Sequence, residues 1–140
     1  MDAYFAGLFD GEGCVAIRRY SPMSKWKSLS PRYTLKVTIC MTHEETVLKL
    51  KEYFGFGNIH QRKHSNIKYK TSFAWEASAG DAQMFMERVR PYVITKRAEI
   101  ELGFEFQKIS GRSAYGKKVK DSITEQRDFF FNKMKTLKRL

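Results

Sequence analysis

Two segments that alternate between apolar and polar side chains most constrain the fold of this chain. Residues 32–40, RYTLKVTIC, alternate along their whole length, and residues 14–20, CVAIRRY, place Val15 and Ile17 on one side. Because successive side chains of a β-strand point to opposite faces, each segment predicts a strand with one buried face. The segment between them, 21–31, contains the serines and prolines typical of a long connection. The pair therefore predicts an antiparallel hairpin.

A second pair of strand-like segments follows a helical one. Residues 42–54, THEETVLKLKEYF, carry apolar side chains at helical spacing, and Thr42 with Glu45 fits a capping box. Residues 58–64 and 69–78 predict two more strands around a polar turn. Further helices are expected over 2–9, 80–92, 95–109 and 122–140, the first of them stopped by the Asp-Gly pair at 10–11. Two hairpins separated by helices predict an α+β fold, with one four-stranded antiparallel sheet and helices on one face.

Length and composition favour a single domain. The 140 residues are 42% hydrophobic, which is enough for a substantial core. We expect residues 1–109 to form the core domain and residues 110–140 to add a basic linker and a C-terminal helix to the same domain. The chain has no long apolar run and no basic segment at its start, so we expect neither a membrane partner nor secretion. Cys14 and Cys40 lack metal-site spacing, and we expect reduced cysteines and an intracellular location: a bacterial or phage-infected cytoplasm, or the interior of an organelle.

The charge balance predicts a polyanionic partner. The chain has 26 Lys+Arg against 15 Asp+Glu, a net charge of +11, and nucleic acid is a better candidate than an anionic membrane surface. The tail from Arg112 to Leu140 is itself strongly basic. Its phenylalanines 129–131 cannot all face one way on a helix, so at least one should pack on the domain while basic residues reach phosphate. A solvated amphipathic helix is the alternative.

The outward faces of the expected strands carry side chains that bind base edges and phosphates. An ordinary solvated sheet face mixes acids with bases, whereas the first three strands place no acid outward. The third strand adds His64, and the fourth places Ser72 and Glu76 on the same side. The alternative is a basic face that is merely solvated. The residues predicted to contact double-stranded DNA are Arg18, Tyr20, Arg32, Thr34, Lys36, Thr38, Asn58, His60, Arg62 and Lys70.

Two acids lie between glycines in FAGLFDGEG, residues 5–13. A carboxylate such as that of Glu12 repels a polyanion unless a cation lies between them. Mg²⁺ binds one or two carboxylates, backbone carbonyls, waters and phosphate oxygens, and such an ion can activate water for phosphodiester hydrolysis. The alternative is a turn acid that accepts nearby backbone N–H groups.

The helix before these acids carries small residues about one turn apart, namely Ala3, Ala6 and Gly7. A small-residue face is typical of close contact between helices, although glycine inside a helix costs about 1 kcal/mol relative to alanine. The motif occurs once in the chain, so the contacting helix would belong to a second subunit related by a two-fold axis. Such a dimer would bring two Glu12 side chains together, one for each DNA strand.

The segment FAGLFDGEG resembles the signature of the LAGLIDADG homing endonucleases. LKLKEYFGFGNI (48–59) and VRPYVITKRAEIELGFEF (89–106) resemble further segments of that family in the same order. The resemblance implies the single-motif, homodimeric type: an αββαββα core with a saddle-shaped sheet in the major groove, followed by C-terminal helices. It also implies cleavage of both strands across the minor groove of a long, near-palindromic site. Short 3′ overhangs would result, and the activity would promote mobility of a host intron or reading frame.

The resemblance further implies roles for individual residues. Glu12 and the backbone carbonyl of Gly11 would hold the ion, with Mg²⁺ expected, Mn²⁺ substituting, Ca²⁺ binding without cleavage, and no small-molecule cofactor. Lys96 would stabilise phosphate charge or help to activate water, with Arg97 as the alternate. Asp10 would support the turn and the interface. The expected dimer-interface residues are Ala3, Ala6, Gly7 and Asp10.

One departure from the family pattern concerns the surroundings of the metal. Some single-motif members carry a glutamine near the end of the second strand, where this chain has Ile39 or Cys40. Neither side chain is a good partner for Mg²⁺ or water. A separate alternative is a catalytically weak or inactive nucleic-acid binder on the same scaffold, such as an RNA maturase or a repressor-like protein. The presence of Glu12 argues for cleavage, because a protein that only binds does not need it.

Overall fold

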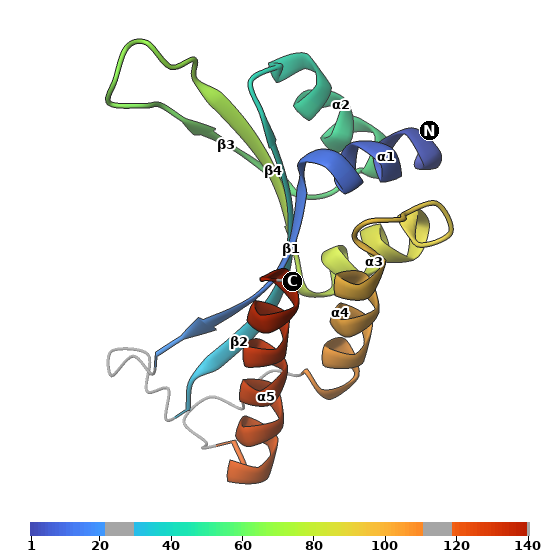
Figure 1. Ribbon diagram of the computed structural model, residues 1–140, viewed down its shortest axis with the longest axis vertical. Helices are drawn as coiled ribbons and strands as arrows, with labels where there is room; N and C mark the ends of the chain where they lie inside the picture. Colours follow the sequence, from blue (N-terminus) through green and yellow to red (C-terminus); the bar gives the residue numbers. More distant parts are fainter. Residues whose placement is uncertain (22–29, 111–118, 140) are drawn as a thin grey trace.

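Within the described residues, four strands form a curved sheet and five helices cover one side of it (Figure 1). The computed structural model describes residues 1–21, 30–110 and 119–139. The elements are α1 (Asp2–Glu12), β1 (Gly13–Tyr20), β2 (Arg32–Met41), α2 (Glu44–Phe54), β3 (Asn58–Arg62), β4 (Ser72–Ser78), α3 (Ala79–Val89), α4 (Arg97–Ile109) and α5 (Asp121–Lys138). No helix within these ranges combines the length and the apolar character needed to cross a bilayer. The α+β fold predicted from the sequence is confirmed.

The four strands are antiparallel and lie in the order β1-β2-β4-β3. The two hairpins therefore meet at β2 and β4, and their outer ends diverge on the open side of the sheet, which gives it the shape of a saddle (Figure 1). The register places Cys14 opposite Thr38, Thr38 opposite Glu76, and Glu76 opposite Asn58. Directly paired residues of neighbouring strands share a face, so these four form one row across the open face.

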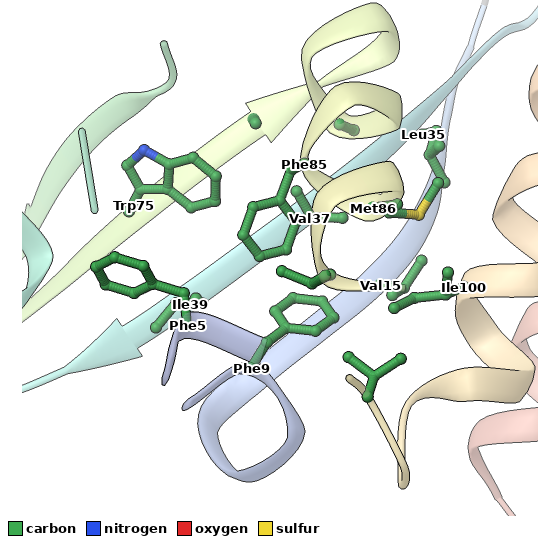
Figure 2. Packing of buried hydrophobic residues seen from close by; sticks show 14 of the residues in the cluster. Phe5, Phe9, Val15, Leu35, Val37, Ile39, Trp75, Phe85, Met86 and Ile100 are labelled. Atoms are coloured by element: carbon green, nitrogen blue, oxygen red, sulfur yellow. The ribbon is translucent and has the colours of Figure 1, made fainter. Parts of the chain in front are cut away.

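The core lies between the other face of the sheet and the helices. Inward residues of β1 and β2, such as Val15 and Leu35, are fully buried, as their alternation predicts. Figure 2 shows how Phe9 of α1 and Phe85 of α3 meet above the sheet, and their ring centroids lie 5.1 Å apart. Trp75 of β4 is also fully buried, and its ring centroid lies 5.1 Å from that of Phe85.

Two helix ends differ from the sequence prediction. Helix α1 does not stop at the Asp-Gly pair but continues to Glu12, and the Gly13 N–H donates to the carbonyl of Phe9. Gly13 itself must be a glycine, because a Cβ atom there would lie 2.2 Å from the Phe9 ring. Helix α2 is capped by His43, whose Nδ1 accepts from the Thr46 N–H at 3.3 Å, so the predicted capping box is wrong. An imidazole nitrogen can satisfy this N–H as a hydroxyl oxygen would.

The second hairpin is shorter than predicted. Strand β3 ends at Arg62 and β4 begins at Ser72, so His64 and Lys70 lie in the exposed connection between them and not on strands. Most of the long connection expected over 21–31 and of the basic linker expected over 110–120 lies outside the described residues.

Helix α5 packs against α4 and against the edge strand β1. Asp128 accepts from the Tyr33 hydroxyl at 2.9 Å and from Arg19 Nη1 at 2.8 Å, which ties the helix to the first hairpin. Phe130 and Phe131 pack against the core, whereas Phe129 remains 60% exposed. The three phenylalanines therefore divide between the core and the solvent, as predicted from the sequence.

Candidate nucleic-acid interface and metal site

One end of the open sheet face is basic and aromatic. The exposed side chain of Arg18 lies on β1 opposite Thr34, and Tyr20 lies opposite Arg32. The Arg32 guanidinium stacks 4.6 Å from the centre of the Tyr20 ring. A planar cation held on an aromatic ring keeps its outward edge free for bases or phosphates.

The middle of the face holds an ion pair that the sequence does not reveal. Lys36 Nζ lies 3.0 Å from Glu76 Oε1, and both side chains are mostly shielded from water. Burial lowers the pKa of Lys36, but the hydrogen bonds and charges of Glu76 and Tyr20 together outweigh it, so the pKa is raised and the lysine stays charged. The charge of Lys36 is therefore balanced in the free chain, and any phosphate that it binds must compete with Glu76.

The other end of the face is formed by β3. Its outward residues Asn58, His60 and Arg62 are exposed. No side-chain hydrogen bond or ion pair occupies His60 or Arg62 within the described part of the chain. Lys70 lies beyond the strand, in a connection whose residues 63–70 are all exposed. The basic groups thus stand at both ends of the saddle, with the Lys36–Glu76 pair between them.

Glu12 is the last residue of α1 and its side chain is exposed. The final carbonyls of a helix have no following turn to donate to them, and the helix dipole places partial negative charge there. The Gly11 carbonyl belongs to the same turn. Among the described residues no three His, Cys, Asp or Glu side chains cluster, so a hard cation would use Glu12, a carbonyl, water and substrate oxygens. These oxygen donors fit Mg²⁺.

Asp10 ties the end of α1 to the start of α4. Its carboxylate accepts the backbone N–H of Ile94 at 2.8 Å and that of Lys96 at 3.1 Å, and the Thr95 hydroxyl donates to the Asp10 carbonyl at 3.0 Å. Burial raises the pKa of Asp10, but the N–H groups of Ile94 and Lys96 outweigh it and hold the pKa below 3.8. These bonds bring Lys96, the N-cap of α4, to the end of α1 that carries Glu12. Asp10 and Ile94 are 84 positions apart, so no local pattern predicts this link.

The residues expected at a dimer interface divide into two groups. Ala3 and Gly7 are exposed, as an interface requires. Ala6 is fully buried in the core of its own chain, so the expectation that its side chain meets a partner is wrong. A Cβ atom at Gly7 or Gly11 would have no atom within 4 Å, so packing within this chain does not require glycine at either position.

Two further findings concern the surroundings of Glu12. Ile39 is fully buried in the core, and Cys40, which lies opposite Ala74 on β4, ends in a thiol, so neither offers the hard oxygen donor that Mg²⁺ prefers. Lys138 of α5 donates from Nζ to the Cys14 sulfur at 3.1 Å, and Cys14 follows Glu12 by two residues. The two residues are 124 positions apart, so no local sequence pattern predicts this contact.

A family model described as LAGLIDADG endonuclease matches residues 5–87, which is more than half of the chain. The chain belongs to this family. The signature FAGLFDGEG, the helix that carries it and the first two hairpins all lie within or at the edge of the matched segment. No curated protein sequence matches the chain.

Solved structures of two homing endonucleases and a meganuclease share the fold. I-CvuI in complex with its target superposes with a TM-score of 0.76 at 20% identity, covering 97% of this chain and 80% of that one. The archaeal intron-encoded I-Vdi141I, complexed with DNA, gives 0.71 at 12% identity, covering 96% and 82%. The meganuclease I-SmaMI, bound to uncleaveable DNA, gives 0.71 at 16% identity, covering 97% of this chain and 44% of that one.

Proposed function

We propose that the chain is a divalent-metal-dependent endonuclease that cuts both strands of DNA at a specific site as a homodimer. The observation that carries this proposal is the position of Glu12, an exposed acid at the C-terminal end of α1 beside a basic sheet face. The proposal includes a long, near-palindromic target, short 3′ overhangs and mobility of the host intron or reading frame. I-CvuI and I-Vdi141I, which share the fold, were solved with bound DNA.

The residues around Glu12 have distinct tasks in this proposal. Glu12 and the Gly11 carbonyl hold Mg²⁺, or Mn²⁺ in its place, whereas Ca²⁺ binds without supporting cleavage. When bound, the ion lowers the pKa of water and stabilises the charge that develops on the phosphate. Lys96 adds a cation near the same phosphate, and Asp10 positions Lys96 through its backbone.

The sheet supplies the affinity and the specificity. Strand β2 has 10 residues, and about 3.3 Å per residue matches roughly ten base steps of 3.4 Å. The outward side chains along the sheet therefore reach phosphates and base edges over one half-site.

The exposed face of α1 supports the dimer. Gly7 costs the helix about 1 kcal/mol relative to alanine, and nothing in the described chain fills the space beside it. A second α1 packed against Gly7 and Ala3 explains the choice of small residues. Two subunits also supply two Glu12 side chains, one for each scissile phosphate.

Digestion of a randomised palindromic DNA library with Mg²⁺, followed by sequencing of the cut ends, tests the proposal. The wild-type protein should yield one family of sites with 3′ overhangs, and Ca²⁺ should support binding without cutting. Glu12→Gln should abolish cutting and keep binding, because the amide removes the anionic ligand. Glu52→Gln is the matched control, since Glu52 is an exposed acid near the end of α2. Cutting by the Glu12 variant would contradict the metal site, and binding without any cutting would support the inactive-binder alternative.

A further inference from the structure

Four of the eight residues that line the groove between β1 and α5 are cations, and the other four are apolar. It forms a hollow of about 300 Å³, and the charged groups around it are Arg18, Arg19, Lys135 and Lys138. Only one of these has an acidic partner among the described residues: Arg19 Nη1 lies 2.8 Å from Asp128 Oδ1. Like charges gathered at close range repel one another, so the groove is suited to an anion.

Helix α5 holds its part of the groove in a fixed position. The buried side chain of Met134 and the Asp128 bonds to the first hairpin fix its rotation. The Phe131 ring contacts cations from both sides of the groove: Lys135 Nζ of α5 lies 4.3 Å and the Arg19 guanidinium of β1 lies 4.8 Å from the ring centre. After Asp128 the helix contains no further acid, so its second half adds only positive charge.

The groove adjoins the proposed DNA site. Cys14 and Arg18 are outward residues of the edge strand β1, and Lys138 donates to Cys14 at 3.1 Å. The C-terminal end of α5 therefore lies beside the start of β1 (Figure 1), where Glu12 ends α1. From Cys14 to Arg18 an extended strand covers about 13 Å, enough for several successive backbone phosphates of one DNA strand.

We propose that the β1–α5 groove, with Lys135 and Lys138 on its helix side, binds backbone phosphates of the DNA that the sheet contacts. The inference rests on the proposed function and adds a second, sequence-independent surface to it. Phosphate contacts fix the position of a protein on the duplex but carry no base information. The groove thus holds the DNA against the β1 edge, while the sheet face reads the sequence.

Binding to a duplex of mixed sequence, measured over a range of salt concentrations, tests the groove separately from cleavage. Each lost phosphate contact reduces the slope of log Kd against log salt by about 0.9, so Lys135→Ala with Lys138→Ala should reduce the slope by about 1.8 per subunit. The affinity near physiological salt should fall about tenfold or more, equally for specific and mixed-sequence DNA. The double replacement by arginine should restore the slope, because arginine keeps the charge.

Lys120→Ala with Lys133→Ala is the matched control, because both lysines are exposed, both belong to α5 or its cap, and neither lines the groove. The control should keep the wild-type slope. An unchanged slope in the Lys135 and Lys138 double variant, with wild-type DNA binding intact, would overturn the groove and leave the proposed function standing. A wild-type chain that does not bind DNA at all would overturn both.

Discussion

Helices α1 and α2 have 11 residues each and bury three each, yet their outward faces differ. Helix α1 buries Phe5, Ala6 and Phe9, and α2 buries Val47, Leu50 and Phe54. The exposed residues of α1 are Ala3, Tyr4, Gly7, Gly11 and Glu12, whereas those of α2 are Glu44, Glu45, Leu48, Lys49, Lys51 and Glu52. A helix whose outer face meets water usually carries charge there, as α2 does.

The proposed dimer accounts for this difference, because in it a second subunit covers the outward face of α1. Apart from Glu12, its exposed residues are small or aromatic, and Tyr4 is 55% exposed. The inward faces of both helices are buried in the core in the same way. Only the outward faces therefore distinguish α2, which meets water, from α1, which is proposed to meet a second subunit. The following substitutions test this division.

Removal of an inward aromatic ring should have the largest effect. Phe9→Ala should cost about 3–5 kcal/mol of unfolding free energy, because the ring is fully buried against Phe85. Leu50→Ala on α2 should cost about 2–5 kcal/mol for the same reason. Leu48→Ala, at a half-exposed position of α2, is the control and should change stability by less than about 0.5 kcal/mol. Denaturant unfolding measures all three, and a small loss for Phe9→Ala would mean that α1 is not part of the core.

Filling the outward face of α1 should break the dimer without unfolding the chain. Gly7→Leu meets no atom of its own chain near the new Cβ and improves helix propensity, so monomer stability should not fall. Sedimentation should show a monomer, whereas we expect a dimer for the wild-type protein, and affinity for a palindromic site should fall about a hundredfold with the loss of two-site binding. Lys51→Leu places the same side chain on the exposed face of α2 and should leave the dimer intact. A Gly7→Leu protein that remains dimeric would place the interface elsewhere.

A moderate effect is expected at Asp10. Asp10→Asn removes a carboxylate that accepts two backbone N–H groups, so we expect a loss of about 1 kcal/mol at neutral pH. Because its pKa is held below 3.8 in the folded chain, the carboxylate stabilises the fold above pH 3.8. This contribution is lost as the pH falls below that value, so the two proteins should converge in acid. Unfolding measured across pH tests this, and a constant difference would assign the effect to something other than the charge.

The smallest effect is expected on the charged face of α2. Glu45 and Lys49 form an exposed pair at 3.7 Å, one helical turn apart. Glu45→Ala should cost at most about 0.5 kcal/mol at low salt and nothing measurable at high salt. Thermal unfolding at two ionic strengths checks this. A large, salt-independent loss would mean that this face also packs against something.

Local periodicity predicted which strand residues face the core, but it did not predict where the helices begin and end. Alternation in 14–20 and 32–40 depends only on neighbouring residues, so inward Val15 and Leu35 followed directly. The end of α1 did not follow, because Gly11 is a helix breaker by propensity while the Gly13 N–H still closes the last turn on Phe9. The prediction that Ala6 lies at a dimer interface was also wrong, because small residues occur both at contacts between helices and at tightly packed core positions. Its burial depends on which elements cover α1.

At the candidate site, too, single residues could be predicted from the sequence, but contacts between distant parts of the chain could not. Glu12 was predicted from its place between glycines in a basic chain and from the family resemblance, and Lys96 from the resemblance alone. The Asp10 bonds that bring Lys96 to the end of α1 join distant parts of the chain and were not predicted. The Lys36–Glu76 pair was missed because it depends on how β2 aligns with β4. Residues that only tertiary packing brings together leave no local pattern to detect.

Along β1 and β2, one set of alternating side chains packs in the core and the other set is proposed to contact DNA. Every fully buried residue of these strands points toward the helices, and the residues of their open face that are proposed to contact DNA point the other way, whereas Arg19 lines the β1–α5 groove. Mutations on the open side can therefore accumulate with little thermodynamic penalty. Descendants of this protein could therefore come to recognise new target sequences while the residues of the hydrophobic core stay the same.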